Sequence, residues 1–126
     1  MIRTISIPYY TSSMDLHVEE KNLKTVITAK TEDYVPEKSP KELIEDALEH
    51  PIGTPKLSEL AKGKNKVVLV TSDHTRAVPS RLTLPILLKE IRKGNPDADI
   101  IILIATGLHR ETTEEEQRRM FGDDIV

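Results

Sequence analysis

The sequence contains no cysteine, no tryptophan and only four other aromatic residues, three tyrosines and one phenylalanine. Without cysteine there is no disulfide framework, thiolate metal site or cysteine nucleophile, so any metal must be bound through nitrogen or oxygen atoms. Four aromatic rings are too few to form a row on which nucleic acid bases stack. No stretch approaches the roughly 20 apolar residues that cross a bilayer, and the N-terminus lacks a signal-peptide pattern. We therefore expect a cytoplasmic protein with no membrane partner.

The charge balance argues against nucleic acid as a partner. The 126 residues carry 18 basic and 21 acidic side chains, a net charge of −3, and the basic residues are scattered along the chain. Nucleic-acid-binding proteins instead gather positive charge in a patch or stripe. Hydrophobic residues make up 37% of the chain, which is enough for a modest core. The length suits one small domain or part of a larger one.

Residues 1–35 have the pattern of a β-rich segment. Apolar and polar residues alternate there in short bursts, and this period of two predicts two or three half-exposed strands. The apolar positions of the bursts are Ile5, Ile7, Leu16, Val18 and Val26. Lys21-Asn22 is expected to form the turn between paired strands.

Residues 39–126 have the pattern of a helical and βαβ portion. Ser39-Pro40-Lys41-Glu42 is a capping box and predicts a helix that ends near His50-Pro51, and a short helix is expected over residues 57–62. A second capping box, Thr113 to Glu116, predicts a helix that ends near Gly122.

Two continuous apolar runs, residues 66–71 and 99–105, are typical of parallel strands covered on both faces. Between them, apolar residues at helical spacing over residues 84–91 predict a helix closed by Gly94. The fold class that we predict is therefore α/β, a Rossmann-like parallel sheet core with the short β-rich N-terminal segment, as part of a larger N-terminal domain. Ile125-Val126 resembles the start of another strand, so we expect the natural polypeptide to continue.

Polar side chains gather in two loops that follow these strands, residues 71–80 and 105–113. In such sheets ligands bind beyond the carboxyl ends of the strands. If the strands are neighbours, five candidates share one edge of the sheet: Asp73, His74, Arg76, His109 and Arg110. The two arginines offer fork-shaped donors for a carboxylate or phosphate, and Thr112 or Thr113 at a helix N-terminus suits an anion. An imidazole held just after the end of a strand suits a general acid or base. His109 is therefore the strongest candidate for a catalytic residue.

Other interpretations of the same residues remain open. Asp73 is also a common turn former, His74 suits an ordinary exposed loop position, and Arg76 suits a surface ion pair with Asp73. Two alternative functions follow from the residues alone. One is a metal-dependent hydrolase whose ligands are Asp73, His74 and His109. The other is a non-catalytic α/β module that binds an anion.

Three segments together resemble the N-terminal part of the lactate racemase family, the enzymes that depend on a nickel-pincer nucleotide. The segments are HPIGTPKLSELAKGKNKVVLV (50–70), SDHTRAVPS (72–80) and ATGLHRETTEEE (105–116). The resemblance extends over essentially the whole chain, from IPYY to FGDDIV. It implies an isomerase that interconverts D- and L-lactate, or a racemase or epimerase of another 2-hydroxy acid.

The resemblance also implies roles for individual residues. The cofactor is nickel pyridinium-3,5-bisthiocarboxylic acid mononucleotide, to which the substrate transfers a hydride while histidines act as acid and base. His109 matches one of these histidines, and Arg76 matches the arginine that binds the substrate carboxylate. Asp73, His74 and Thr75 match positions near the cofactor.

Family members are roughly three times this length and carry a second, C-terminal domain. The second catalytic histidine, the lysine that anchors the cofactor and the histidine that binds nickel are all expected beyond residue 126. We therefore expect residues 1–126 to be an N-terminal fragment that lacks the remainder of its domain and the C-terminal domain. By itself this fragment is predicted to be inactive.

Overall fold

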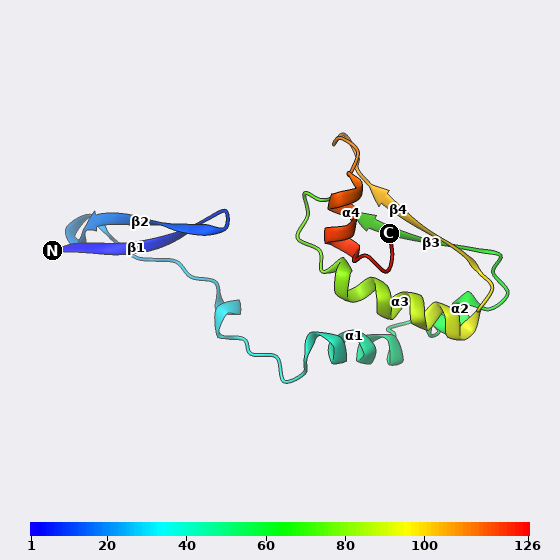
Figure 1. Cartoon of the computed structure of the whole chain (residues 1–126). Coiled ribbons are helices and arrows are strands. Elements are labelled where there is room, and N and C mark those ends of the chain that lie inside the picture. Colours follow the sequence, from blue (N-terminus) through cyan, green and yellow to red (C-terminus); the bar gives the residue numbers. More distant parts are fainter. The chain divides into compact units, whose positions relative to one another are not determined.

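A computed structural model describes residues 1–126, apart from the side chain at position 32. The chain is mixed α/β, as predicted, and divides into two compact units, Met1–Pro36 and Glu37–Val126 (Figure 1). Within the described part, no helix is long and apolar enough to span a membrane.

The first unit is an antiparallel hairpin. Strand β1 (Ile2–Tyr9) pairs with β2 (Ser12–Glu19), with Ile5 opposite Leu16. The chain reverses at Tyr10, which has a φ of 53° in the left-handed region. Two-residue hairpin loops need this conformation because it matches the twist of the strands.

Of the predictions for this unit, the turn is wrong, whereas two of the expected two or three strands are present. The turn expected at Lys21-Asn22 is instead a short 3-10 helix, η1 (Glu20–Asn22), and a second one, η2, follows at Lys30–Asp33. The possible third strand near Val26 is absent, since residues 24–29 have neither helix nor strand. The true turn lacks glycine, proline and asparagine, so nothing in its composition marked it.

The second unit contains four α-helices, and both capping boxes are present in it. They are α1 (Pro40–Glu49), α2 (Leu57–Ala61), α3 (Ser80–Gly94) and α4 (Glu114–Phe121). The cap of α1 is local: the Ser39 backbone nitrogen donates to the Glu42 carboxylate at 2.8 Å. The predicted starts of α1 and α4 are therefore confirmed.

Strands β3 (Lys66–Ser72) and β4 (Asp99–Ala105) form the parallel pair that the apolar runs predict. They are joined through α3, which packs against α1, α2 and α4 (Figure 1). In register, Ser72 lies opposite Ala105, so both strands end at the same edge.

The expectation that both faces of these strands are covered is wrong for this chain. Exposure alternates along each strand, and Val70 and Leu103 are 68% and 52% exposed. Their neighbours Leu69 and Ile102 are half-buried. A single βαβ unit places its helix on one face only, so these residues leave the second face open. The strand expected at Ile125-Val126 is also absent, because residues 123–125 form a turn.

The core of this unit lies around α3. Its most buried hydrophobic side chains are Ala61, Leu84, Ile91, Ala98 and Phe121. Ile91 is 0% exposed. The Asn95 amide, just after α3, donates to the carbonyls of Ala61 and Lys64 at 2.9 and 2.7 Å. These bonds fix the end of α3 against the connection that leads into β3.

Gly94 gives the first test of this packing. A Cβ atom at position 94 would overlap the carbonyl oxygen of Ser58 in α2. Helix propensity alone predicts that G94A stabilises α3 by about 1 kcal/mol. We instead expect G94A to lower the free energy of unfolding by about 1–3 kcal/mol, because the backbones of α2 and α3 must separate. Urea denaturation measures this difference, with Lys89→Ala on the exposed side of α3 as the control. Unchanged or increased stability of G94A would contradict the close packing of α2 and α3.

Candidate functional site

The candidate site lies where the loops after β3 and β4 leave the common edge of the sheet. The first loop begins at Asp73 and the second at Thr106. Each loop turns sharply: the Arg76 nitrogen donates to the Asp73 carbonyl at 3.2 Å, and the His109 nitrogen donates to the Thr106 carbonyl at 3.0 Å. The turns place polar side chains from both loops next to one another.

Asp73 is the centre of the site, although it is only 2% exposed. Its Oδ1 atom accepts hydrogen bonds from the backbone nitrogen and the hydroxyl of Thr75, at 3.0 and 2.6 Å. Asp73 therefore forms a local turn, which is the alternative role that the sequence suggests for it. The hydroxyl of Thr75 is therefore directed at Asp73.

The second oxygen of Asp73 binds the other loop. Nδ1 of His109 donates to Oδ2 of Asp73 at 2.5 Å, because an ionised carboxylate can only accept. The hydrogen bonds from Thr75 and from His109 hold the pKa of Asp73 well below its usual range. The carboxylate therefore stays ionised, fixes the orientation of the imidazole and leaves Nε2 as the atom that can exchange a proton.

His74 and Arg110 have a different partner, the carboxylate of Glu116 in α4. Arg110 binds it with two nitrogens, at 2.6 and 2.9 Å, and Nδ1 of His74 lies 3.7 Å from it. Nδ1 of His74 also lies 3.5 Å from the hydroxyl of Thr112. The guanidinium of Arg110 is therefore already paired with Glu116, whereas the sequence suggests that it is free to bind an anionic ligand.

The N-terminus of α4 is occupied in the same way. Glu116 accepts from the Thr113 backbone nitrogen at 2.9 Å, and the Thr113 hydroxyl accepts from the Glu116 nitrogen at 3.3 Å. The Thr113 nitrogen, part of the anion cradle expected at Thr112 and Thr113, is thus bonded to a carboxylate of the chain itself.

Arg76 is exposed and lies in the same loop as Asp73. In the described part of the chain its side chain forms no ion pair, and the suggested pair with Asp73 is absent because Asp73 binds His109 instead. A guanidinium in this setting is accessible to an anionic ligand.

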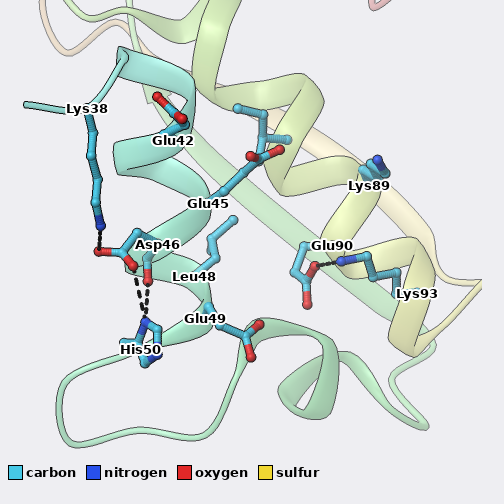
Figure 2. A pocket seen from close by; sticks show the side chains of 11 residues that line it. Lys38, Glu42, Glu45, Asp46, Leu48, Glu49, His50, Lys89, Glu90 and Lys93 are labelled. Atoms are coloured by element: carbon cyan, nitrogen blue, oxygen red, sulfur yellow. Dashed lines mark hydrogen bonds and ion pairs between the residues drawn. The ribbon is translucent and has the colours of Figure 1, made fainter.

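Outside the loops, a charged groove of about 500 Å³ lies between α1 and α3 (Figure 2). Two ion pairs lie within it: Lys38 lies 3.0 Å from Asp46, and Lys93 lies 2.6 Å from Glu90. His50 also contacts Asp46, at 3.3 Å. The groove contains none of the candidate residues of the two loops.

Among the described residues, no group of three histidine or acidic side chains lies together as metal ligands do. His109 turns Nδ1 to Asp73, whereas His74 turns Nδ1 to Thr112. The arrangement of these side chains therefore gives no support to a zinc or manganese site built from Asp73, His74 and His109.

Glu116 is the residue whose contacts sequence reasoning missed. The acidic run to which it belongs predicts a solvated face, and this is correct for Glu114 and Glu115, which are exposed. The capping-box spacing identified Glu116 as a helix cap. That spacing does not predict the contacts of the Glu116 carboxylate with Arg110 and His74, since these contacts depend on how the loops fold.

Comparison with known proteins places this chain in a family. Residues 9–126 match the family model of the lactate racemase N-terminal domain. The lactate racemases of Thermoanaerobacterium thermosaccharolyticum and Lactiplantibacillus plantarum are 47% and 42% identical to the chain, over 97% of it. The chain spans 29% of the length of each of these curated relatives.

A solved structure agrees with this relationship. The lactate racemase apoprotein from T. thermosaccharolyticum has a TM-score of 0.83 and 45% identity to the chain, with 98% of this chain and 28% of that one covered. The chain therefore belongs to the lactate racemase N-terminal domain family.

Proposed function

We propose that the complete polypeptide to which this chain belongs interconverts the two enantiomers of lactate, and that residues 73–109 supply part of its active site. The observation that supports this most directly is the hydrogen bond between buried Asp73 and half-exposed His109. It joins the ends of two strands in a chain whose relatives are lactate racemases.

In this proposal His109 is the acid and base. With Nδ1 bound to Asp73, a neutral imidazole presents an unprotonated Nε2, which takes the proton from the hydroxyl group at C2 of the substrate. The imidazolium that forms is stabilised by the ionised Asp73. In the opposite direction Nε2 returns the proton. Asp73 and Thr75 act through His109, since Thr75 holds Asp73 and Asp73 holds the ring.

Arg76 is proposed to bind the carboxylate of the substrate. Its planar fork matches the two oxygens of a carboxylate, and its side chain is exposed. Binding at this position fixes one end of the substrate while His109 acts at the hydroxyl. Lactate is the proposed substrate, and another 2-hydroxy acid presents the same two groups.

When bound, the nickel-pincer nucleotide expected for the family would supply the acceptor for the hydride at C2. Asp73, His74 and Thr75, the residues expected near this cofactor, do not form a complete site for it in this chain. Asp73 is buried and engaged with Thr75 and His109, and Thr75 directs its hydroxyl at Asp73. His74 faces Thr112 and Glu116. We therefore assign proton transfer and carboxylate binding to this chain, and the anchoring of the cofactor to the remainder of the polypeptide.

The role of His109 is tested by His109→Ala in the complete polypeptide, produced with bound cofactor. Loss of the acid and base should lower kcat for D- and L-lactate interconversion by about 10²–10⁴-fold. The matched control is His50→Ala, which removes an exposed imidazole outside the loops. A His109→Ala protein that retains wild-type kcat would refute the assignment. If the cofactor-loaded wild type is inactive on lactate, the same assay is repeated with other 2-hydroxy acids.

The role of Arg76 is tested by Arg76→Ala with the same assay. We expect KM for lactate to rise by about tenfold or more, because the lost ion pair with a carboxylate contributes on the order of 1.5–3 kcal/mol. Arg81→Ala, another exposed arginine, is the control. An unchanged KM would show that the carboxylate binds elsewhere. A non-catalytic anion-binding module would instead bind lactate normally after His109→Ala, lose binding after Arg76→Ala, and show no turnover in either case.

A further inference from the structure

The carboxylate of Glu116 meets the immediate neighbours of both members of the Asp73–His109 pair. Arg110, which directly follows His109, binds both of its oxygens, at 2.6 Å from Oε1 and 2.9 Å from Oε2. His74, which directly follows Asp73, lies 3.7 Å from Oε2. One side chain of α4 therefore binds the loop after β4, and it pairs with the loop after β3 as well when His74 is protonated.

A helix cap alone does not require these contacts, as α1 demonstrates. Glu42 occupies the same position in the capping box of α1, and it is exposed and bonded to Ser39. Glu116 makes the equivalent bond to Thr113, but its side chain is only 15% exposed. The two additional partners distinguish Glu116 from an ordinary capping residue.

The loop that carries His109 has few other supports on its outer side. A Cβ atom at Gly107 would meet nothing within 4 Å, and Leu108 is fully exposed. The hydrogen bond of Arg110 to the Glu111 carbonyl, at 2.8 Å, is internal to the loop. The pair between Arg110 and Glu116 thus fixes the residue immediately after His109 to α4, and two positions further on the Thr112 carbonyl accepts a hydrogen bond from the Gln117 side chain of α4 at 3.0 Å.

Glu116 is ionised at neutral pH. Hydrogen bonds from Arg110 and from the Thr113 backbone lower the pKa of Glu116 to about 2. The same pairing raises the pKa of Arg110 above its ordinary value. The ion pair therefore persists across the neutral pH range.

We propose that Glu116 is a positioning residue for the acid/base His109: it ties together the loops after β3 and β4 and so keeps the imidazole against Asp73. Glu116 also engages the guanidinium of Arg110, which leaves Arg76 as the arginine of these loops that receives the substrate carboxylate. This inference rests on the proposed function of His109, and it assigns no contact between Glu116 and the substrate.

The variant that tests this inference is Glu116→Gln in the complete polypeptide. Glutamine is the other residue that capping boxes use at this position, so the bond to Thr113 is kept while the charge that binds Arg110 and faces His74 is removed. Glu42→Gln makes the same change in the cap of α1, and Glu115→Gln makes it at an exposed neighbour in α4. Together the controls separate the loss of a cap or a surface charge from the loss of the connection between the loops.

Two measurements follow on each protein. The first is lactate racemisation, in which Glu116→Gln should lower kcat about tenfold and leave KM within about twofold, since misplacement of an acid/base group affects turnover more than binding. The second is the tautomer of His109, from ¹⁵N NMR of the cofactor-free protein at a pH where imidazoles are neutral. We expect one Nδ1-protonated form in the wild type and a mixture of both tautomers in Glu116→Gln.

A fourth variant, Arg110→Gln with Glu116→Gln, tests the pairing itself. Because both changes break the same contact, the double variant should be no more impaired than Glu116→Gln alone. The inference is overturned if Glu116→Gln keeps the wild-type kcat and a single His109 tautomer, or if Glu42→Gln reduces kcat equally. If the wild type is inactive on lactate, the proposed function fails, and the NMR comparison alone decides the role of Glu116.

Discussion

The parallel register of β3 and β4 is the constraint on which the site depends. Because Ser72 lies opposite Ala105, the first residues of the two loops emerge together, and a hydrogen bond between Asp73 and His109 becomes possible across 36 positions of sequence. A shift of one residue would turn every side chain of a strand to the other face of the sheet. The packing of α3 and its neighbours on one face therefore also determines where the acid/base candidate lies.

Burial of Asp73 gives this hydrogen bond its chemical significance. An ionised carboxylate removed from water is costly unless it is hydrogen-bonded, and Thr75 and His109 provide the compensating donors. The same bonds that satisfy the carboxylate restrict the imidazole to one orientation and one protonated nitrogen. The proposed acid/base group is thus oriented by the same hydrogen bonds that compensate the buried carboxylate.

The sequence was informative where structure is determined by neighbouring residues. The capping boxes at Ser39 and Thr113 located the starts of two helices, and the apolar runs located the parallel strands. The sequence was misleading where a turn lacks the usual turn residues and where the structure depends on contacts with other elements. The turn at Tyr10 has no compositional signal, and two apolar runs cannot reveal which neighbouring elements cover them. Arg110 has the chemistry of an anion donor, but its partner is supplied by α4.

The distribution of charge at the strand ends argues for a small carboxylic acid as the ligand of these loops. Two free guanidinium groups beside an open helix N-terminus would suit a phosphate, which carries more charge and more acceptors. Here Glu116 binds Arg110 and the Thr113 nitrogen at the start of α4, so that part of this anion-binding capacity is used within the chain. Arg76 remains accessible for one further anion. In the proposed function, Arg76 would bind the carboxylate of a 2-hydroxy acid and Nε2 of His109 would exchange the proton of its hydroxyl group.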